Sequence, residues 1–177
     1  MKKFALLILS GLVLASCDYT DPKPVDHHAE MGARVDSLAA IVMSNDSVID
    51  VQLAENLEHA YKDFNKAFPE DSLVVWNTFN LGVLYSGLPG KEYFAIEQFA
   101  IVYDDYRDHP LAPQALYNMG IMFDTRNDKE KAAMTFQEFV NQYPEHDWAE
   151  AARAMVELNA DSVDLEAQVD QWLQQAQ

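Results

Sequence analysis

The chain is poor in cysteine, glycine and basic residues. Cys17 is its single cysteine, so no internal disulfide can form. The six glycines are scattered and form no phosphate-binding loop, and the serines lack the context of a nucleophile elbow. Twelve Lys and Arg oppose 29 Asp and Glu, and the formal net charge of −17 argues against nucleic acid and anionic lipid as partners. We therefore expect neither catalysis nor a cofactor.

Hydrophobic residues make up 49% of the 177 positions, which is enough for the core of one domain. They recur at spacings of three and four, and no segment alternates with the period of a strand. This pattern predicts an all-α fold. We expect helices over about 28–43, 48–68, 73–86, the nineties to about 107, two within 110–144, 148–158 and 163–174, with a turn at 159–162.

The first residues have the pattern of a signal peptide. Lys2 and Lys3 precede an apolar run, residues 4–15, that is too short to span a bilayer as a helix. The run ends in Leu-Ala-Ser-Cys at positions 14–17, which resembles a bacterial lipobox. That resemblance implies cleavage after residue 16 and lipidation of Cys17. Residues 17–27, with two prolines, would then be the lipidated N-terminus and a stiff tether to a folded domain over 28–177.

The lipobox implies a place in the cell envelope. Lipobox cysteines carry more than one acyl chain in the families that this motif resembles, and two chains make a stable membrane anchor. Asp18 would keep the protein in the inner membrane under the enterobacterial sorting rule, and other lineages sort differently. We expect a lipid-anchored protein that faces the periplasm, on the outer membrane by preference, with the inner membrane as the alternative.

Residues 110–144 contain the clearest internal pattern, running from one proline to the next in 34 residues. Small, large and aromatic residues fall where a helical hairpin needs them: Leu116, Met119, Gly120, Phe123, Ala132, Phe136 and Pro144. We expect Gly120 and Ala132 to let two helices approach closely while the phenylalanines fill their crossing. A second copy contains Leu81, Gly82, Tyr85, Ala95 and Phe99, with one residue inserted at the 86–90 loop and three more in a longer second helix.

These residues and their spacing resemble the tetratricopeptide repeat. The segments HPLAPQALYNMG (109–120) and YPEHDWAEAA (143–152) are similar to those of periplasmic and outer-membrane repeat lipoproteins. Barrel-assembly lipoproteins of the BamD type, YbgF-type repeat domains and small Bacteroidetes lipoproteins are of this kind. The resemblance implies an α-solenoid of about three to four helical hairpins. Phe139 stands where the repeat usually has alanine, which implies looser or shifted packing toward the next repeat.

The resemblance also implies a concave face, lined by the first helix of each hairpin, that binds a peptide or protein partner. Its positions fall on residues that are mostly apolar: Trp76, Phe79, Val83, Gln114, Tyr117 and Ile121. Clustered exposed aromatics mark partner sites. The alternative is that the N-terminal helix pair or the 86–90 loop covers these side chains and makes them core.

Smaller motifs each allow a plain structural interpretation. His27, His28 and Glu30 are too few for a four-ligand metal site, and a solvated linker is the simpler interpretation. His109 and His146 lie at repeat turns, where capping is expected. Four Asp-Ser-apolar tripeptides begin at Asp36, Asp46, Asp71 and Asp161. They resemble O-glycosylation sites of Bacteroidetes, and helix capping explains most of them equally well.

Our leading hypothesis is a membrane-anchored, periplasm-facing scaffold that holds another protein. One alternative is an accessory role in outer-membrane β-barrel assembly or cell-envelope maintenance. The other is an enzyme or a metal-binding protein, for which the sequence offers no convergent set of polar residues.

Overall fold

The computed structural model describes residues 26–44 and 50–160. Six helices are bounded within them: α1 (His27–Met43), α2 (Val51–Ala67), α3 (Leu73–Ser86), α4 (Glu92–Asp105), α5 (Ala112–Thr125) and α6 (Lys129–Gln142). Residues 149–160 are helical too. The described residues form helices and turns and no strand, which confirms the all-α prediction.

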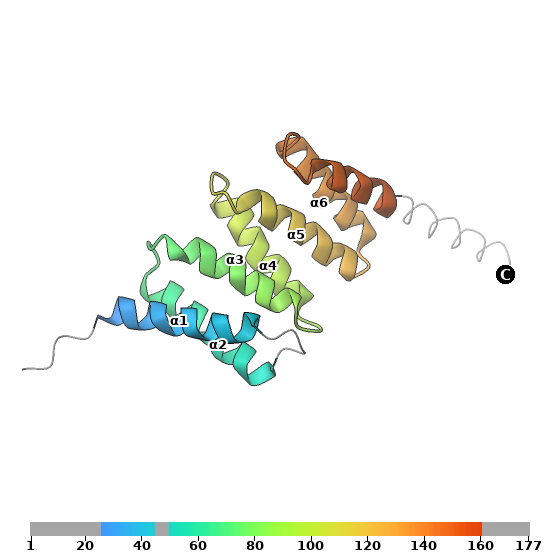
Figure 1. Cartoon of the computed structure of the whole chain (residues 1–177). Helices are drawn as coiled ribbons and strands as arrows, with labels where there is room; N and C mark the ends of the chain where they lie inside the picture. Colours follow the sequence, from blue (N-terminus) through green and yellow to red (C-terminus); the bar gives the residue numbers. More distant parts are fainter. Residues whose placement is uncertain (1–25, 45–49, 161–177) are drawn as a thin grey trace, which may run out of the picture.

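The helices pair into hairpins, α1 with α2, α3 with α4 and α5 with α6, which follow one another in a row (Figure 1). Each helix packs against its neighbours along the chain. The first helix of each hairpin, together with residues 149–160, forms the near layer in Figure 1, and the second helices form the other layer. The chain is therefore an all-α helical-repeat solenoid. Its described part contains three hairpins and the first helix of a fourth.

Aspartate side chains begin three of the helices. Asp26 accepts the backbone N–H of Ala29 at the start of α1, and Asp50 accepts that of Leu53 at the start of α2. Asp128 does the same for α6 through the N–H of Lys131. A helix leaves its first N–H groups without intrahelical partners, so a carboxylate at this position determines where the helix starts.

Two hairpins close with a phenylalanine ring against a glycine. A Cβ added at Gly82 would lie 2.7 Å from the Phe99 ring, and one at Gly120 would lie 2.8 Å from the Phe136 ring. Both rings are buried, as is the alanine one turn before each of them. The predicted close approach at the small residues is confirmed. The side chain that enters the space above each glycine is the phenylalanine of the partner helix.

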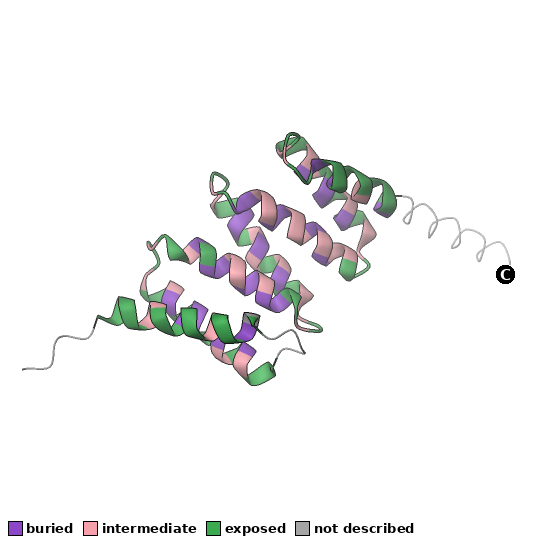
Figure 2. Ribbon diagram, viewed as in Figure 1, coloured by how far each residue is buried: buried purple, intermediate pink, exposed green. Residues whose placement is uncertain are grey.

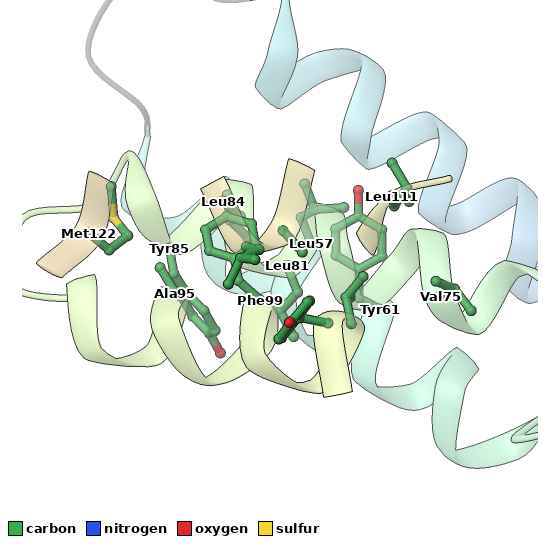
Figure 3. Close-up of a cluster of buried hydrophobic side chains, with 14 of the residues drawn as sticks. Leu57, Tyr61, Val75, Leu81, Leu84, Tyr85, Ala95, Phe99, Leu111 and Met122 are labelled. Carbon is green, nitrogen blue, oxygen red and sulfur yellow. The ribbon is translucent and has the colours of Figure 1, made fainter. Parts of the chain in front are cut away.

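The core lies between the two layers of helices (Figure 2). Figure 3 shows the part of it in which side chains of α2, α3 and α4 meet. The largest apolar side chains that are fully buried are Leu57, Tyr61, Phe64, Leu84, Phe99, Val102, Leu116, Phe136 and Phe139. Each such side chain stabilises the fold by roughly 1.5–3 kcal/mol relative to exposure. Because the core is continuous from hairpin to hairpin, each hairpin depends on its neighbours.

The turns between hairpins share one geometry. The C-cap residues of α2, α4 and α6 are all aromatic, with φ between −132° and −128°: Phe68, Tyr106 and Tyr143. Three positions later, a side chain accepts the backbone N–H two residues ahead of it. The acceptor atoms are Asp71 Oδ1, His109 Nδ1 and His146 Nδ1, at 2.8, 3.2 and 3.1 Å. Asp71 and His109 lie one and two residues before the N-caps of α3 and α5, Ser72 and Leu111, which make no side-chain cap hydrogen bond. These side chains therefore stabilise the turns, and the predicted N-cap role is wrong for α3 and α5.

These turns show that the proline-to-proline spacing is the wrong measure of the repeat. Pro144 directly follows the C-cap Tyr143, whereas Pro110 comes four residues after the C-cap Tyr106. The two C-caps are 37 positions apart. α4 and α6 have the same length, 14 residues each, and α4 ends at Asp105. The expected extension of α4 toward Arg107 is therefore also wrong. Turns accept proline at several positions, so a proline alone does not define a register.

The inserted residue in the second hairpin lies where the sequence predicts it. Five residues, 87–91, connect α3 to α4, and three residues, 126–128, connect α5 to α6. The difference is two residues rather than one because α3 ends four residues after Gly82, whereas α5 ends five residues after Gly120. Each connection turns at one residue in the left-handed region, Gly90 with φ 78° and Asn127 with φ 59°. Glycine and asparagine tolerate this region best, so the longer connection needs no strained residue.

Two local expectations are wrong. Phe139 is fully buried among the rings of Tyr117, Tyr143 and His146, at centroid distances of 5.5, 5.5 and 5.3 Å. The looser of the two expected arrangements is therefore wrong, because two of these rings lie edge-on to Phe139 and the third is tilted against it. Shifted packing toward the next repeat stays a prediction. Asn159 is helical rather than part of a turn, and its side-chain amide donates to the Met155 carbonyl.

Several sequence predictions lie outside the described residues. They are the signal peptide, Cys17 and most of the tether in residues 1–25, the Asp46 tripeptide, and the Asp161 tripeptide with the helix expected over 163–174.

Candidate functional site

The concave positions named from the sequence lie on α3 and α5. Trp76 is the most open of them, with 47% of its surface exposed. The other five are half-buried: Phe79, Val83, Gln114, Tyr117 and Ile121. The apolar members of this half-buried set pack against the core.

Phe79 and Tyr117 occupy matching places in successive hairpins. The Phe79 ring lies 5.6 Å from the Phe99 ring, and the Tyr117 ring lies 5.3 Å from the Phe136 ring. Each thus covers the phenylalanine of its own hairpin's second helix. The alternative is cover by the N-terminal helix pair or the 86–90 loop. The aromatic rings that contact Phe79 and Tyr117 belong instead to second helices and, for Tyr117, also to Trp148.

Trp76 has a different environment from Phe79. Its indole ring lies 5.7 Å from His109, edge to face, above the turn that leads into α5. On another side it borders a cavity of about 150 Å³ between α1 and α3. Trp76 therefore lies at the rim of the cavity, while the other apolar residues of the predicted concave set pack against the core of the hairpins.

Three helices form this cavity. One stripe of α1 and one stripe of α3 make the walls, each with the three- and four-residue spacing of a helix face, and α2 makes the floor. The lining residues are Gly32, Val35, Asp36, Ala39, Tyr61, Phe64, Leu73, Trp76, Asn77 and Asn80. Gly32 and Ala39 are small, so the α1 wall leaves open the space opposite the large side chains of α3.

A polar network stands behind the α3 wall. The amide of Asn77, which is buried, donates to Asn65 Oδ1 at 3.0 Å, and the Asn65 amide donates to the Thr78 hydroxyl at 3.2 Å. Thr78 in turn donates to the Val74 carbonyl at 2.7 Å. The network links α2 to α3, and it holds the Asn77 side chain in one orientation at the cavity.

Asp36 is the charged group of the lining. Burial raises the pKa of Tyr61, and the negative charge of Asp36 raises it further, while a hydrogen bond with the Asn80 side chain acts in the opposite direction. Asp36 is exposed and takes part in no ion pair within the described residues. The cavity thus combines apolar walls, amides and one unpaired carboxylate.

Sequence reasoning found Trp76 but missed the rest of this cavity. Asp36, Tyr61 and Asn80 come from three helices, and no motif connects positions so far apart. The available signal was indirect. Two small residues on the same stripe of α1, Gly32 and Ala39, could have marked a gap opposite α3.

The histidines near the start of α1 do not form a metal site. His27 Nδ1 lies 3.6 Å from Glu30, but His28 turns to Asp71, with Nε2 and Oδ2 2.7 Å apart, and its ring packs against Phe64. His28 is therefore a packing residue that joins α1 to the first repeat turn, and its expected place in a solvated linker is wrong. Within residues 26–44 and 50–160, no group of three or more His, Cys, Asp or Glu is placed to hold a metal ion.

None of the helices in the described ranges has the length and apolar content of a bilayer-spanning helix. A comparison with known families matches residues 114–146 to the tetratricopeptide repeat. This match covers nearly all of α5 and α6 and ends in the turn that His146 caps. No curated protein shows significant similarity to the chain. The matched repeat and the row of hairpins together support a tetratricopeptide-repeat protein.

Proposed function

We propose that this chain is a scaffold that binds a partner protein on its first-helix face, around Trp76. The observation that carries the proposal is the placement of an exposed indole ring beside a cavity, on the layer formed by α1, α3 and α5. Tryptophan is enriched among the few residues that dominate binding energy at protein interfaces. The other predicted concave residues are half-buried, and the apolar ones pack against the core, so a partner can bind around Trp76 with little rearrangement of the solenoid.

The proposed scaffold is a lipoprotein attached to a bacterial membrane through Cys17 and facing the periplasm, with the outer membrane favoured. The lipobox resemblance at positions 14–17 and the repeat segments that are similar to those of BamD- and YbgF-type proteins support this part of the proposal. The acidic composition fits a domain that stands away from an anionic surface.

Photo-cross-linking at position 76 tests the partner site. A cross-linking amino acid in place of Trp76 is expected to trap a discrete partner in cells. The same amino acid in place of Met134, which is 65% exposed on α6, serves as the matched control. Identical product patterns from the two positions would count against the proposal. Barrel-assembly components among the products specific to position 76 would identify the scaffold as an accessory of that process.

Two substitutions separate binding from folding. Trp76→Ala is expected to reduce partner capture at least about tenfold, as hot-spot residues do, and to leave the melting temperature nearly unchanged. Phe79→Ser is expected to lower the free energy of unfolding by about 3 kcal/mol or more, because Phe79 packs on Phe99 in the hairpin. A large stability loss from Trp76→Ala would mean that Trp76 is a core residue.

Membrane partition tests the anchor. Cys17→Ser removes the thiol that would be acylated, and the variant is expected to leave the membrane fraction. Metabolic labelling with an alkyne fatty acid provides the direct control, because only the unchanged chain should incorporate it. A Cys17→Ser protein that still partitions with membranes would refute the lipid anchor without touching the partner site.

A further inference from the structure

We propose that the cavity between α1 and α3 receives a lysine or arginine side chain of the bound partner, with Asp36 as its counter-ion. This inference rests on the proposed function, because it specifies what the surface around Trp76 recognises. It commits to one occupant, a basic side chain presented by a peptide segment.

The size and shape of the cavity fit a single side chain. Its volume is about 150 Å³, and an apolar cavity of about that size holds one benzene molecule. The walls supply apolar surface for a methylene stem, through Val35, Ala39 and Leu73. A basic side chain buries its stem along such surface and keeps its charged end near polar groups.

The polar groups of the cavity select a cation over an apolar or acidic group. Asp36 is the charged residue among those lining the cavity, and it takes part in no ion pair within the described residues. The face of the Trp76 indole attracts a cation, and the carboxamide oxygens of Asn77 and Asn80 can accept hydrogen bonds from one. An acidic side chain would meet Asp36 as a like charge, and an aliphatic one would leave the carboxylate without a partner.

The net charge of the whole chain also favours a basic partner over an acidic one. A net charge of −17 attracts a basic segment from a distance and repels an acidic one, which speeds association with the former. Arg34 is the basic residue nearest to Asp36 along α1, and it lines a separate hollow with Ser37, Leu38 and Asn56. The cavity's own carboxylate is therefore available to a basic group that arrives from outside.

Peptide selection tests the inference without knowledge of the natural partner. Short random peptides displayed on phage are selected on the full chain, and the enriched peptides are measured by fluorescence anisotropy. We expect a lysine or arginine at one fixed position of the enriched peptides. Replacing it by norleucine, which keeps the stem and removes the ammonium, should weaken binding by about three- to tenfold, the range of a partly exposed ion pair with a cation–π contact.

Two variants and one control place the effect in the cavity. Asp36→Asn should reduce the affinity as much as the norleucine peptide does, and the two changes together should cost little more than either alone. Ala39→Leu fills the cavity without changing charge and should also weaken binding. Asp63→Asn removes the same charge from an exposed position of α2 outside the cavity and should leave affinity nearly unchanged.

The outcomes distinguish this inference from the proposed function. Two results would overturn the cavity's role and still support the partner surface. One is a set of peptides whose affinity depends on Trp76 but which contain no lysine or arginine at a fixed position. The other is an affinity that Asp36→Asn does not change. Peptides that are weakened equally by Asp63→Asn and Asp36→Asn would also overturn the cavity's role, because the effect would then come from net charge. Failure to enrich any peptide, or binding that is indifferent to Trp76→Ala, would overturn both.

Discussion

Two glycines determine how closely the helices of the α3–α4 and α5–α6 hairpins approach. In an exposed helix, replacing glycine with alanine stabilises because glycine loses more backbone entropy on folding. At Gly82 and Gly120 a phenylalanine ring occupies the space that a Cβ would need. At the residue scale, the neighbouring helix therefore decides whether a Gly-to-Ala change stabilises or destabilises the fold.

Gly120→Ala is expected to destabilise the protein by about 1–3 kcal/mol, the usual cost of overpacking a well-filled core. The new Cβ would lie 2.8 Å from the buried Phe136 ring, which must shift. Urea denaturation measures the change. Gly32→Ala is the matched control, because the nearest atom to its new Cβ is 3.8 Å away, and it should stabilise by about 0.5–1 kcal/mol. Equal effects of the two changes would contradict this account.

At the scale of elements, the turns between hairpins use two different side chains for one task. Asp71 and His109 occupy equivalent positions. Asp71 accepts the N–H of Leu73, the first residue of α3, and His109 accepts the N–H of Leu111, the N-cap residue of α5. The physical requirement is an acceptor of the right reach, since the N–H groups at a helix start have no intrahelical partner. The residue type is free as long as this requirement is met.

His109→Ala is expected to lower the free energy of unfolding by about 1 kcal/mol, the typical net contribution of one hydrogen bond, because the N–H of Leu111 loses its acceptor. His109→Asp should recover most of that loss, because Asp71 supplies the same acceptor in the first turn. Thermal melting of the two variants side by side measures the difference. If the loss came from the ring contact with Trp76, the aspartate variant would be as unstable as the alanine one.

A hydrogen bond between α4 and α6 makes the free energy of unfolding depend on pH in the alkaline range. Tyr103 on α4 donates to Glu138 on α6 at 3.0 Å. Burial, then the hydrogen bond to Glu138 and its charge, raises the pKa of Tyr103 to about 12. An unfolded tyrosine has a pKa of about 10. The folded state therefore keeps the Tyr103 proton up to a higher pH than the unfolded state does. The stabilisation from protonated Tyr103 is complete below about pH 10 and is lost as the pH rises toward 12.

Tyr103→Phe should therefore flatten the fall of the melting temperature between about pH 10 and about pH 12. At neutral pH it should cost roughly 1 kcal/mol for the lost hydrogen bond. Tyr93→Phe, at a position that is 62% exposed, serves as the control and should follow the unchanged protein. Some slope will remain, because burial also raises the pKa of Tyr61, Tyr85 and Tyr143. An unchanged slope in Tyr103→Phe would contradict the assignment.

At the scale of the whole molecule, the acidic charge is largely uncompensated. Among the ion pairs of the described residues, only His28–Asp71 joins distant parts of the chain, and the others link residues three to five positions apart. Such local pairs contribute little. Self-repulsion at a net charge of −17 should therefore outweigh them and should destabilise the folded state at low salt.

The melting temperature should rise as NaCl increases from about 10 mM to about 150 mM, because the Debye length falls from about 30 Å to about 8 Å over that range. Repeating the series with KCl excludes a specific ion effect. Binding of a basic peptide should weaken over the same range, since screening acts on attraction as well as on repulsion. A melting temperature that falls with salt would mean that favourable ion pairs dominate.

Much of the fold could be predicted from local pattern. Spacing of apolar residues located the helices, since a helix face is determined by residues three and four apart. Gly120 and Phe136 indicated a close hairpin, and His109 marked a turn, although it does not cap α5. The proline spacing misled, because Pro110 and Pro144 look alike in sequence and stand at different places in their turns.

The amino-acid sequence by itself determined an all-α chain of helical hairpins, because apolar spacing depends on residues close together in the chain. Its resemblance to the tetratricopeptide repeat added Trp76 as a candidate surface position. Only the tertiary structure decided that Phe79 and Tyr117 belong to the hairpins, and that Asp36, Tyr61 and Trp76 meet around one cavity. That cavity depends on how α1 packs beside α3 over the floor of α2. Packing between distant segments leaves no local period in the sequence from which it could have been predicted.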